Sequence, residues 1–98
     1  MTDSVVIIPT YNEIGNINNT LNKIENLSVN FNIIIVDDNS PDGTAQLVNK
    51  IIDSKKLKSK ITLINRKAKN GLGSAYIEGF KKALNQNYDY NLISHLIF

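Results

Sequence analysis

Apolar residues follow two different periods along this chain. Three short apolar runs, at residues 5–8, 31–36 and 61–64, are rich in Ile and Val. Runs of this length that contain many β-branched residues and end in polar residues or Pro predict β-strands. The run at 31–36 is almost continuously apolar, which is typical of a strand buried on both faces of a parallel sheet.

A helical period follows each of these runs. After the first run, apolar residues recur at steps of three and four over residues 14–27, at Ile14, Ile17, Leu21, Ile24 and Leu27. After the second, Ser40 offers an N-cap and Pro41 a first helical position, and the buried stripe is Ala45, Leu47, Val48, Ile51 and Ile52. After the third, a loop at 66–73 with two glycines leads to the stripe Ala75, Tyr76, Phe80, Ala83 and Leu84. The sequence therefore predicts three amphipathic helices.

This order of elements predicts an α/β fold, in which right-handed crossovers place helices over a parallel sheet. Residues 89–98 are expected to enter a fourth strand. A length of 98 residues suits one small domain with one modest core, since a chain of this size cannot bury two. We therefore expect residues 1–98 to form a single domain.

Composition and charge exclude several classes of function. The net charge is only +2, and the basic residues are mostly Lys, so no dense basic stripe for nucleic acid is predicted. Cysteine is absent, which excludes disulfides and thiol chemistry. The N-terminal segment is neither basic nor long enough in its apolar part for a signal peptide or membrane span, so a cytosolic start is expected. The lysine-rich segment 55–60 is interpreted as a solvated helix end, with a membrane-surface role as the alternative.

Polar residues with binding chemistry follow the first two apolar runs. In an open parallel sheet, the carboxyl ends of neighbouring strands line the ligand crevice. Tyr11 offers an aromatic face for a planar base, and Glu13 can accept hydrogen bonds from a base or ribose. Asp37 and Asp38 repel each other and need donors or a cation, and strand alternation sends them to opposite sides. We expect one of them to be structural and the other to face a nucleotide or sugar.

Plainer interpretations stay open for these segments. Thr10 or Asn12 could cap the first helix with Glu13 in its first turn, and both aspartates could serve as structural caps. Residues 40–44 fit an ordinary helix entry on their own.

The loop before the third helix and the single histidine give weaker signals. Gly71 and Gly73 match neither phosphate-binding fingerprint in spacing and are interpreted as permitting a tight turn. Arg66, Lys67 and Lys69 lie beside these glycines and could face an anion. Taken one at a time, each is interpreted as a solvated cation. His95 has no partner at metal-ligand or triad spacing and is left without a role.

Three motifs together resemble a known family. They are Val-Ile-Ile-Pro-Thr-Tyr-Asn-Glu at 6–13, Val-Asp-Asp-Asn-Ser-Pro-Asp-Gly-Thr at 36–44 and Gly-Leu-Gly-Ser-Ala-Tyr-Ile-Glu-Gly-Phe at 71–80. In this order and spacing they resemble the N-terminal part of the dolichyl-phosphate (polyprenyl-phosphate) mannosyltransferases of glycosyltransferase family 2. The resemblance extends to about residue 90 and implies a Rossmann-like nucleotide-sugar-binding fold of the GT-A type.

The resemblance also implies donor-binding residues. Five positions match those that contact the guanosine part of GDP-mannose in this family: Pro9, Tyr11, Glu13, Val36 and Asp38. Val36 would act through its backbone, and Asp37 would support the site. The implied partners are GDP-mannose, dolichyl phosphate at the cytosolic face of the endoplasmic reticulum and small membrane subunits. The implied product, dolichyl phosphate mannose, serves protein glycosylation and GPI-anchor synthesis.

The implied reaction is an inverting displacement by a lipid phosphate, with a divalent cation, Mg²⁺ or Mn²⁺, on the donor pyrophosphate. In the family this cation is held by an Asp-x-Asp motif at the end of the next strand, and residues 1–98 contain no such motif. Asp89 precedes the apolar run and is expected near the opposite edge of the sheet. We therefore expect no catalytic or metal residues in this chain, and we interpret it as an incomplete domain from a truncated or misread gene.

Alternatives of other classes are kept open. The motifs at 36–44 and 71–80 are close to both the mannose and the glucose members of the polyprenyl-phosphate subgroup, so a polyprenyl-phosphate glucosyltransferase that uses UDP-glucose is one alternative. A fragment that only binds nucleotide would keep the same contacts. Residues 33–39 also resemble the first strand of a phosphoacceptor receiver domain, but that interpretation leaves residues 9–13 without explanation.

Overall fold

The structure, a computed structural model, describes residues 4–27, 31–67, 71–86 and 93–95. Strands and helices alternate along the chain, as the hydrophobic pattern predicts. In order, they are β1 Ser4–Thr10, α1 Ile17–Glu25, β2 Phe31–Asp37, α2 Thr44–Ser54, β3 Ile61–Asn65, α3 Leu72–Asn85 and β4 Ile93–His95.

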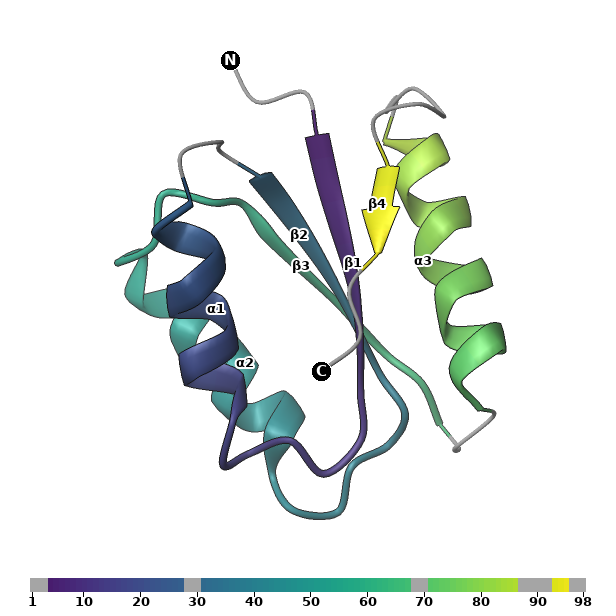
Figure 1. Ribbon diagram of the computed structural model, residues 1–98. Coiled ribbons are helices and arrows are strands. Elements are labelled where there is room, and N and C mark those ends of the chain that lie inside the picture. The colour runs from purple at the N-terminus through teal and green to yellow at the C-terminus, as the bar shows by residue number, and fades with distance from the viewer. Residues whose placement is uncertain (1–3, 28–30, 68–70, 87–92, 96–98) are drawn as a thin grey trace.

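The four strands form one parallel sheet in the order β3-β2-β1-β4. The first three strands progress in one direction, and β4 then joins the opposite side of β1, so the strand order reverses at β1. Helices α1 and α2 cover one face of the sheet and α3 covers the other (Figure 1). In open α/β sheets, such a reversal point lies beside the ligand crevice.

The core lies in two layers that follow the alternation of side chains along the central strands. Val6, Ile8, Ile33 and Ile35 pack with the apolar residues of α1 and α2, whereas the residues between them face α3. Helix α3 approaches β1 closely, because Gly79 is buried and an ideal Cβ there would lie 2.5 Å from Cγ2 of Ile7. Glycine at position 79 therefore lets α3 pack directly against β1.

Helix α1 is shorter than its apolar period predicts. It begins at Ile17 and ends at Glu25, and Ile14 and Leu27 are 44% and 52% exposed. Residues 14–16 form a turn, and Asn12 before it has a left-handed φ of 56°. The capping interpretation of Thr10, Asn12 and Glu13 is therefore wrong: the N-cap is Asn16, which makes no side-chain cap bond.

Helix α2 also begins later than predicted. It starts at Thr44 after Gly43, whose φ of 94° is left-handed, and not at Pro41. The hydroxyl of Ser40 bonds to Asp37 instead of to a helix N–H group. The apolar stripe of the helix is as predicted, and the segment after it carries exposed lysines at 55, 56, 58 and 60.

The third predicted helix and the fourth predicted strand are both present, with differences in detail. Leu84 is exposed, and buried Gly79 takes a place on the inner side of α3 between Ala75 and Ala83. The predicted fourth strand is present as β4, which pairs with β1. Asp89 lies outside the described residues, so its expected place near the opposite edge stays a prediction.

Candidate functional site

A hollow of about 170 Å³ lies at the carboxyl end of the sheet, where the strand order reverses. It is lined by the end of β1 and the loop that follows, by the residue after β2 and by the start of α3. Four of the five predicted donor-binding residues line it together with three others: Pro9, Tyr11, Glu13 and Asp38, with Thr10, Gly71 and Leu72. Tyr11 is 38% exposed, so its ring is accessible to a ligand.

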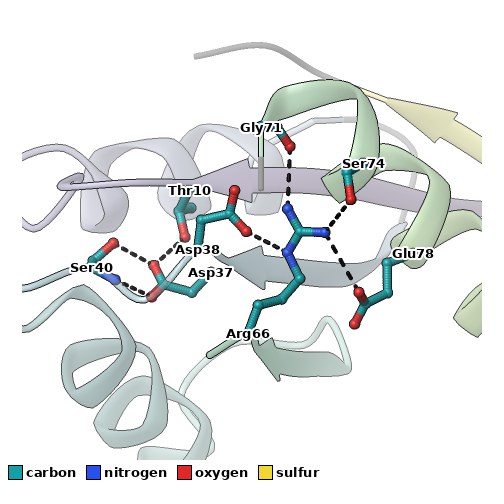
Figure 2. Close-up of polar contacts among 8 residues, drawn as sticks. All are labelled: Thr10, Asp37, Asp38, Ser40, Arg66, Gly71, Ser74 and Glu78. Atoms are coloured by element: carbon teal, nitrogen blue, oxygen red, sulfur yellow. Dashed lines mark hydrogen bonds and ion pairs between the residues drawn. The ribbon is translucent and has the colours of Figure 1, made fainter. Parts of the chain in front are cut away.

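Asp37 is buried and holds the two strand ends together. Its carboxylate accepts hydrogen bonds from the Thr10 hydroxyl at 2.6 Å, from the Ser40 hydroxyl at 2.7 Å and from the Ser40 N–H at 2.9 Å. Figure 2 shows these partners on one side of the strand end. Asp37 is therefore the structural member of the acidic pair, a choice that strand alternation alone leaves open.

Asp38 points the other way and forms an ion pair with Arg66. The Arg66 Nε–H donates to one oxygen of Asp38, and both side chains are almost fully buried (Figure 2). The hydrogen bond from the guanidinium to Asp38 outweighs the effect of burial and raises the pKa of Arg66. The carboxylate of Asp38 thus lines the hollow in an orientation set by a permanently charged partner.

Arg66 also connects this carboxylate to helix α3. Its Nη1 donates to the Ser74 hydroxyl at 2.7 Å and lies 3.5 Å from a carboxylate oxygen of Glu78, and its Nη2 donates to the Gly71 carbonyl at 3.2 Å. One side chain therefore joins the end of β2 to the first turns of α3, where Gly71 and Leu72 line the hollow.

The interpretation of Arg66 as a solvated cation is wrong, because the residue is only 7% exposed. The signal that could have identified it is its identity: it is the single Arg among eleven basic residues and directly follows a predicted strand. Arg is preferred over Lys where a buried carboxylate must be paired, since its planar fork makes several hydrogen bonds at once. Lys67 is exposed, as expected, and Lys69 lies outside the described residues.

Val36 is the one predicted donor-binding residue that does not line the hollow. Its side chain is fully buried and packs on the α3 side of the sheet. A contact with a nucleotide would have to use its backbone, and that contact stays a prediction. His95 belongs to β4, and Gly71 takes a positive φ of 95° at the entry to α3, as the tight-turn interpretation of this glycine requires.

The described residues do not fit a divalent cation. Such a cation needs several oxygen ligands that are not committed elsewhere. The two oxygens of Asp37 accept bonds from Thr10 and Ser40, and one oxygen of Asp38 accepts from Arg66. No group of three His, Cys, Asp or Glu side chains comes together within residues 4–27, 31–67, 71–86 and 93–95.

Over the same described ranges, the helices of the chain are too short or too polar to cross a membrane.

Comparison with known proteins gives a consistent result. The chain is 37% identical over 86 residues to an undecaprenyl-phosphate mannosyltransferase of Micrococcus luteus, a match that covers 87% of this chain and 34% of that protein. It is 40% identical over 80 residues to a dolichol-phosphate mannosyltransferase of Pyrococcus furiosus, covering 80% of this chain and 22% of that protein. The chain thus spans about a third or less of the length of these relatives.

A solved structure supports the fold as well. A mannosyltransferase from Pyrobaculum calidifontis, determined in complex with GDP-Man and Mn²⁺, is similar with a TM-score of 0.76 and 26% identity over 83% of this chain and 24% of that chain. This likeness confirms the predicted GT-A type of nucleotide-sugar-binding fold. The sequence profile described as Glycosyl transferase family 2 matches residues 5–93. The receiver-domain alternative is therefore wrong, and the chain belongs to glycosyl transferase family 2.

Proposed function

We propose that this chain forms the donor-nucleotide part of a polyprenyl-phosphate mannosyltransferase and binds the guanosine of GDP-mannose. The observation that carries the proposal is the hollow at the carboxyl end of β1, where an accessible tyrosine and two carboxylates meet the start of α3. Relatives named as polyprenyl-phosphate mannosyltransferases and a similar structure that holds GDP-Man support it.

Each lining residue has a chemical task in this proposal. The ring of Tyr11 and the adjacent Pro9 pack against the base and ribose, because both offer flat apolar surface. The carboxylates of Glu13 and Asp38 accept hydrogen bonds from base N–H or ribose hydroxyl groups. Leu72 adds apolar surface from α3, and Val36 contributes a backbone contact.

The reaction of the whole enzyme is proposed to be a direct displacement at the anomeric carbon by a lipid phosphate, with inversion. The acceptor phosphate is already anionic near neutral pH, so the reaction needs no strong general base. Its largest demand is stabilisation of the charge that develops on the departing GDP. The residues that line the hollow supply the binding of the nucleoside, and no chemical step is assigned to them.

The finer parts of the proposal rest on the resemblance in the three motifs. They are dolichyl phosphate as acceptor, inversion at the sugar, a divalent cation on the donor, action at the cytosolic face of the endoplasmic reticulum and small membrane subunits as partners.

Titration of the chain with GDP, UDP and buffer tests the proposal directly. Isothermal titration calorimetry should show binding of GDP that is stronger than binding of UDP. A preference for UDP would favour the glucosyltransferase alternative. Absence of binding to either nucleotide would contradict the proposal.

Three variants locate the binding. Tyr11→Ala should weaken GDP binding by roughly five- to 150-fold, because stacking of a base on an aromatic ring contributes about 1–3 kcal/mol. Leu72→Ala, in the hollow, should weaken binding less, whereas Ile77→Ala, on the same helix and 60% exposed outside the hollow, should leave it unchanged. Equal effects of Leu72→Ala and Ile77→Ala would place the nucleotide elsewhere.

A further inference from the structure

The loop after β1 is held by side chains from residues 40–44, which comprise part of the loop after β2 and the first residue of α2. Three successive N–H groups of the first loop donate to three different side chains of the second. Asn12 N–H donates to the Ser40 hydroxyl at 2.9 Å, Glu13 N–H to the Thr44 hydroxyl at 3.0 Å and Ile14 N–H to the Asp42 carboxylate at 3.1 Å. The two loops are therefore joined at every residue from 12 to 14.

The second loop is itself tied down at the residues that accept these bonds. The hydroxyl of Ser40 donates to Asp37, which is anchored on β1 through Thr10. The carboxylate of Asp42 accepts from both the hydroxyl and the N–H of Thr44. Because these acceptors are held by further bonds, they offer fixed positions to the first loop.

Two backbone features fit this arrangement. Asn12 has a φ of 56°, in the left-handed region that Asn tolerates better than most residues. Gly43 has a φ of 94°, and a Cβ there would lie 3.3 Å from Cδ1 of Ile14, so glycine lets the two loops approach. The turn at Asn12 lies between Tyr11 and Glu13, and both of these line the hollow.

We propose that Ser40, Asp42 and Thr44 are positioning residues for the nucleotide site, acting through the backbone of residues 12–14. None of the three lines the hollow. They set the shape of the loop that carries Tyr11 and Glu13, and this role rests on the function proposed above. Without the bonds, the loop would have to be ordered when the nucleotide binds, and that ordering would reduce affinity.

Thr44 allows a sharp test, because its hydroxyl can be removed without a change of shape. Thr44→Val keeps the branched side chain but leaves the N–H of Glu13 without its acceptor, whereas Thr44→Ser keeps the hydroxyl. GDP affinity should fall about tenfold in Thr44→Val, equivalent to about 1.4 kcal/mol, and should stay within about twofold in Thr44→Ser. Affinity that is equal in the two variants would overturn the proposal.

Asp42 has a counterpart at the other end of the sheet that serves as a control. Glu25 also accepts two backbone N–H bonds and one hydroxyl bond, from Lys58 and Ser59. Asp42→Asn and Glu25→Gln therefore remove the same kind of interaction from two different loops. Asp42→Asn should weaken GDP binding severalfold, and Glu25→Gln should not; equal losses would show a general effect of stability and would overturn the proposal.

Amide hydrogen exchange in the nucleotide-free chain separates this proposal from the proposed function. Exchange at Glu13 and Ile14 should become faster in Thr44→Val and Asp42→Asn and remain unchanged in Glu25→Gln. Unchanged exchange in the first two variants would overturn the proposal that these side chains hold the loop. If exchange responds as expected but the unaltered chain binds neither GDP nor UDP, the proposed function fails and the loop-holding role stands.

Discussion

Each end of the sheet carries a loop that is tied to a carboxylate from another segment. At the amino end, Glu25 at the end of α1 accepts bonds from Lys58 and Ser59, just before β3. At the carboxyl end, Asp42 accepts bonds from Ile14 and from Thr44. In each of these ties, meaning a carboxylate with the bonds that it accepts, the donors are two backbone N–H groups and one hydroxyl.

The surroundings of the two ties differ. The tie at the amino end stands among the exposed lysines 55, 56, 58 and 60. The tie at the carboxyl end borders the loop of Tyr11, next to the buried pair of Asp38 and Arg66. Both fastened loops line a hollow, and the two hollows differ in their residues. The one at the amino end is lined by Ser59, by lysines and by aliphatic residues, whereas the one at the carboxyl end is lined by Tyr11, Glu13 and Asp38.

The largest effect is expected at the carboxyl end, from Arg66→Met. This change leaves Asp38 buried without its cation, and breaking a buried pair in this way costs about 3–5 kcal/mol. Urea unfolding should show the loss of stability. The double variant Arg66→Met with Asp38→Asn should recover part of it, because the remaining side chain is no longer charged. A loss under about 1 kcal/mol in the single variant would mean that solvent already stabilises Asp38.

Asp37→Asn should have the next largest effect. The amide keeps the shape of the side chain but offers one acceptor oxygen in place of two, so a donor at Thr10 or Ser40 loses its partner. The expected loss of unfolding free energy is about 2 kcal/mol. Denaturant unfolding measures it, and Glu25→Gln, a partly exposed position, should lose less than half as much. Equal losses would contradict the expectation that the bonds of Asp37 at the carboxyl end contribute more to stability than those of Glu25 at the amino end.

Acid should weaken both ties. Partial burial raises the pKa of Glu25, but N–H and hydroxyl donors from Lys58 and Ser59 outweigh it and hold the pKa below its ordinary value. At Asp42 a desolvation effect is likewise outweighed, here by the Thr44 hydroxyl and the N–H groups of Ile14 and Thr44. A lowered folded-state pKa gives stability that is present above the unfolded-state pKa and is lost as pH falls through the folded-state value.

The measurement is unfolding in urea at several pH values between about 6 and 3. The stability deficits of Glu25→Gln and Asp42→Asn relative to the unaltered chain should be full at the upper pH and should shrink toward the lower one. Deficits that do not change with pH would show that the carboxylates act only through their shape.

The smallest effect is expected from Ser74→Ala. The Ser74 hydroxyl accepts one bond from Arg66, but Ser74 is exposed and water can replace it. Stability should fall by about 0.5 kcal/mol or less. A loss above about 1.5 kcal/mol, measured by thermal unfolding, would show that Ser74 rather than Asp38 is the main partner of Arg66.

The sequence predicts the strands, the helices and the α/β class because these follow from apolar periods, which packing against the sheet enforces. It also predicts which residues gather at the carboxyl end, and Pro9, Tyr11, Glu13 and Asp38 do line one hollow. Helix starts are less predictable. The apolar period of α1 includes Ile14, but Ile14 lies in the turn before the helix, where it contacts a loop 28 residues away in the sequence, and no local pattern records that contact.

The role of Arg66 was not predictable from its neighbours in the chain. Two lysines accompany it within the next three positions, so the segment has the composition of a solvated loop. Its burial depends on Asp38, which is 28 residues earlier in the sequence, and on Gly71 and Ser74 after it. Such long-range pairing is set by the arrangement of the strands and leaves little trace in local composition.

The bonds between the first two loops have a consequence for the order of synthesis. Residues 10–14 obtain their partners from residues 37–44, between 27 and 31 positions later in the chain. A nascent chain therefore exposes β1 and its loop for about thirty residues of translation before either can adopt its final shape. The hollow forms only when β1 and β2 have paired, so a chain released before Thr44 emerges would lack the bonds that hold the loop at residues 12–14.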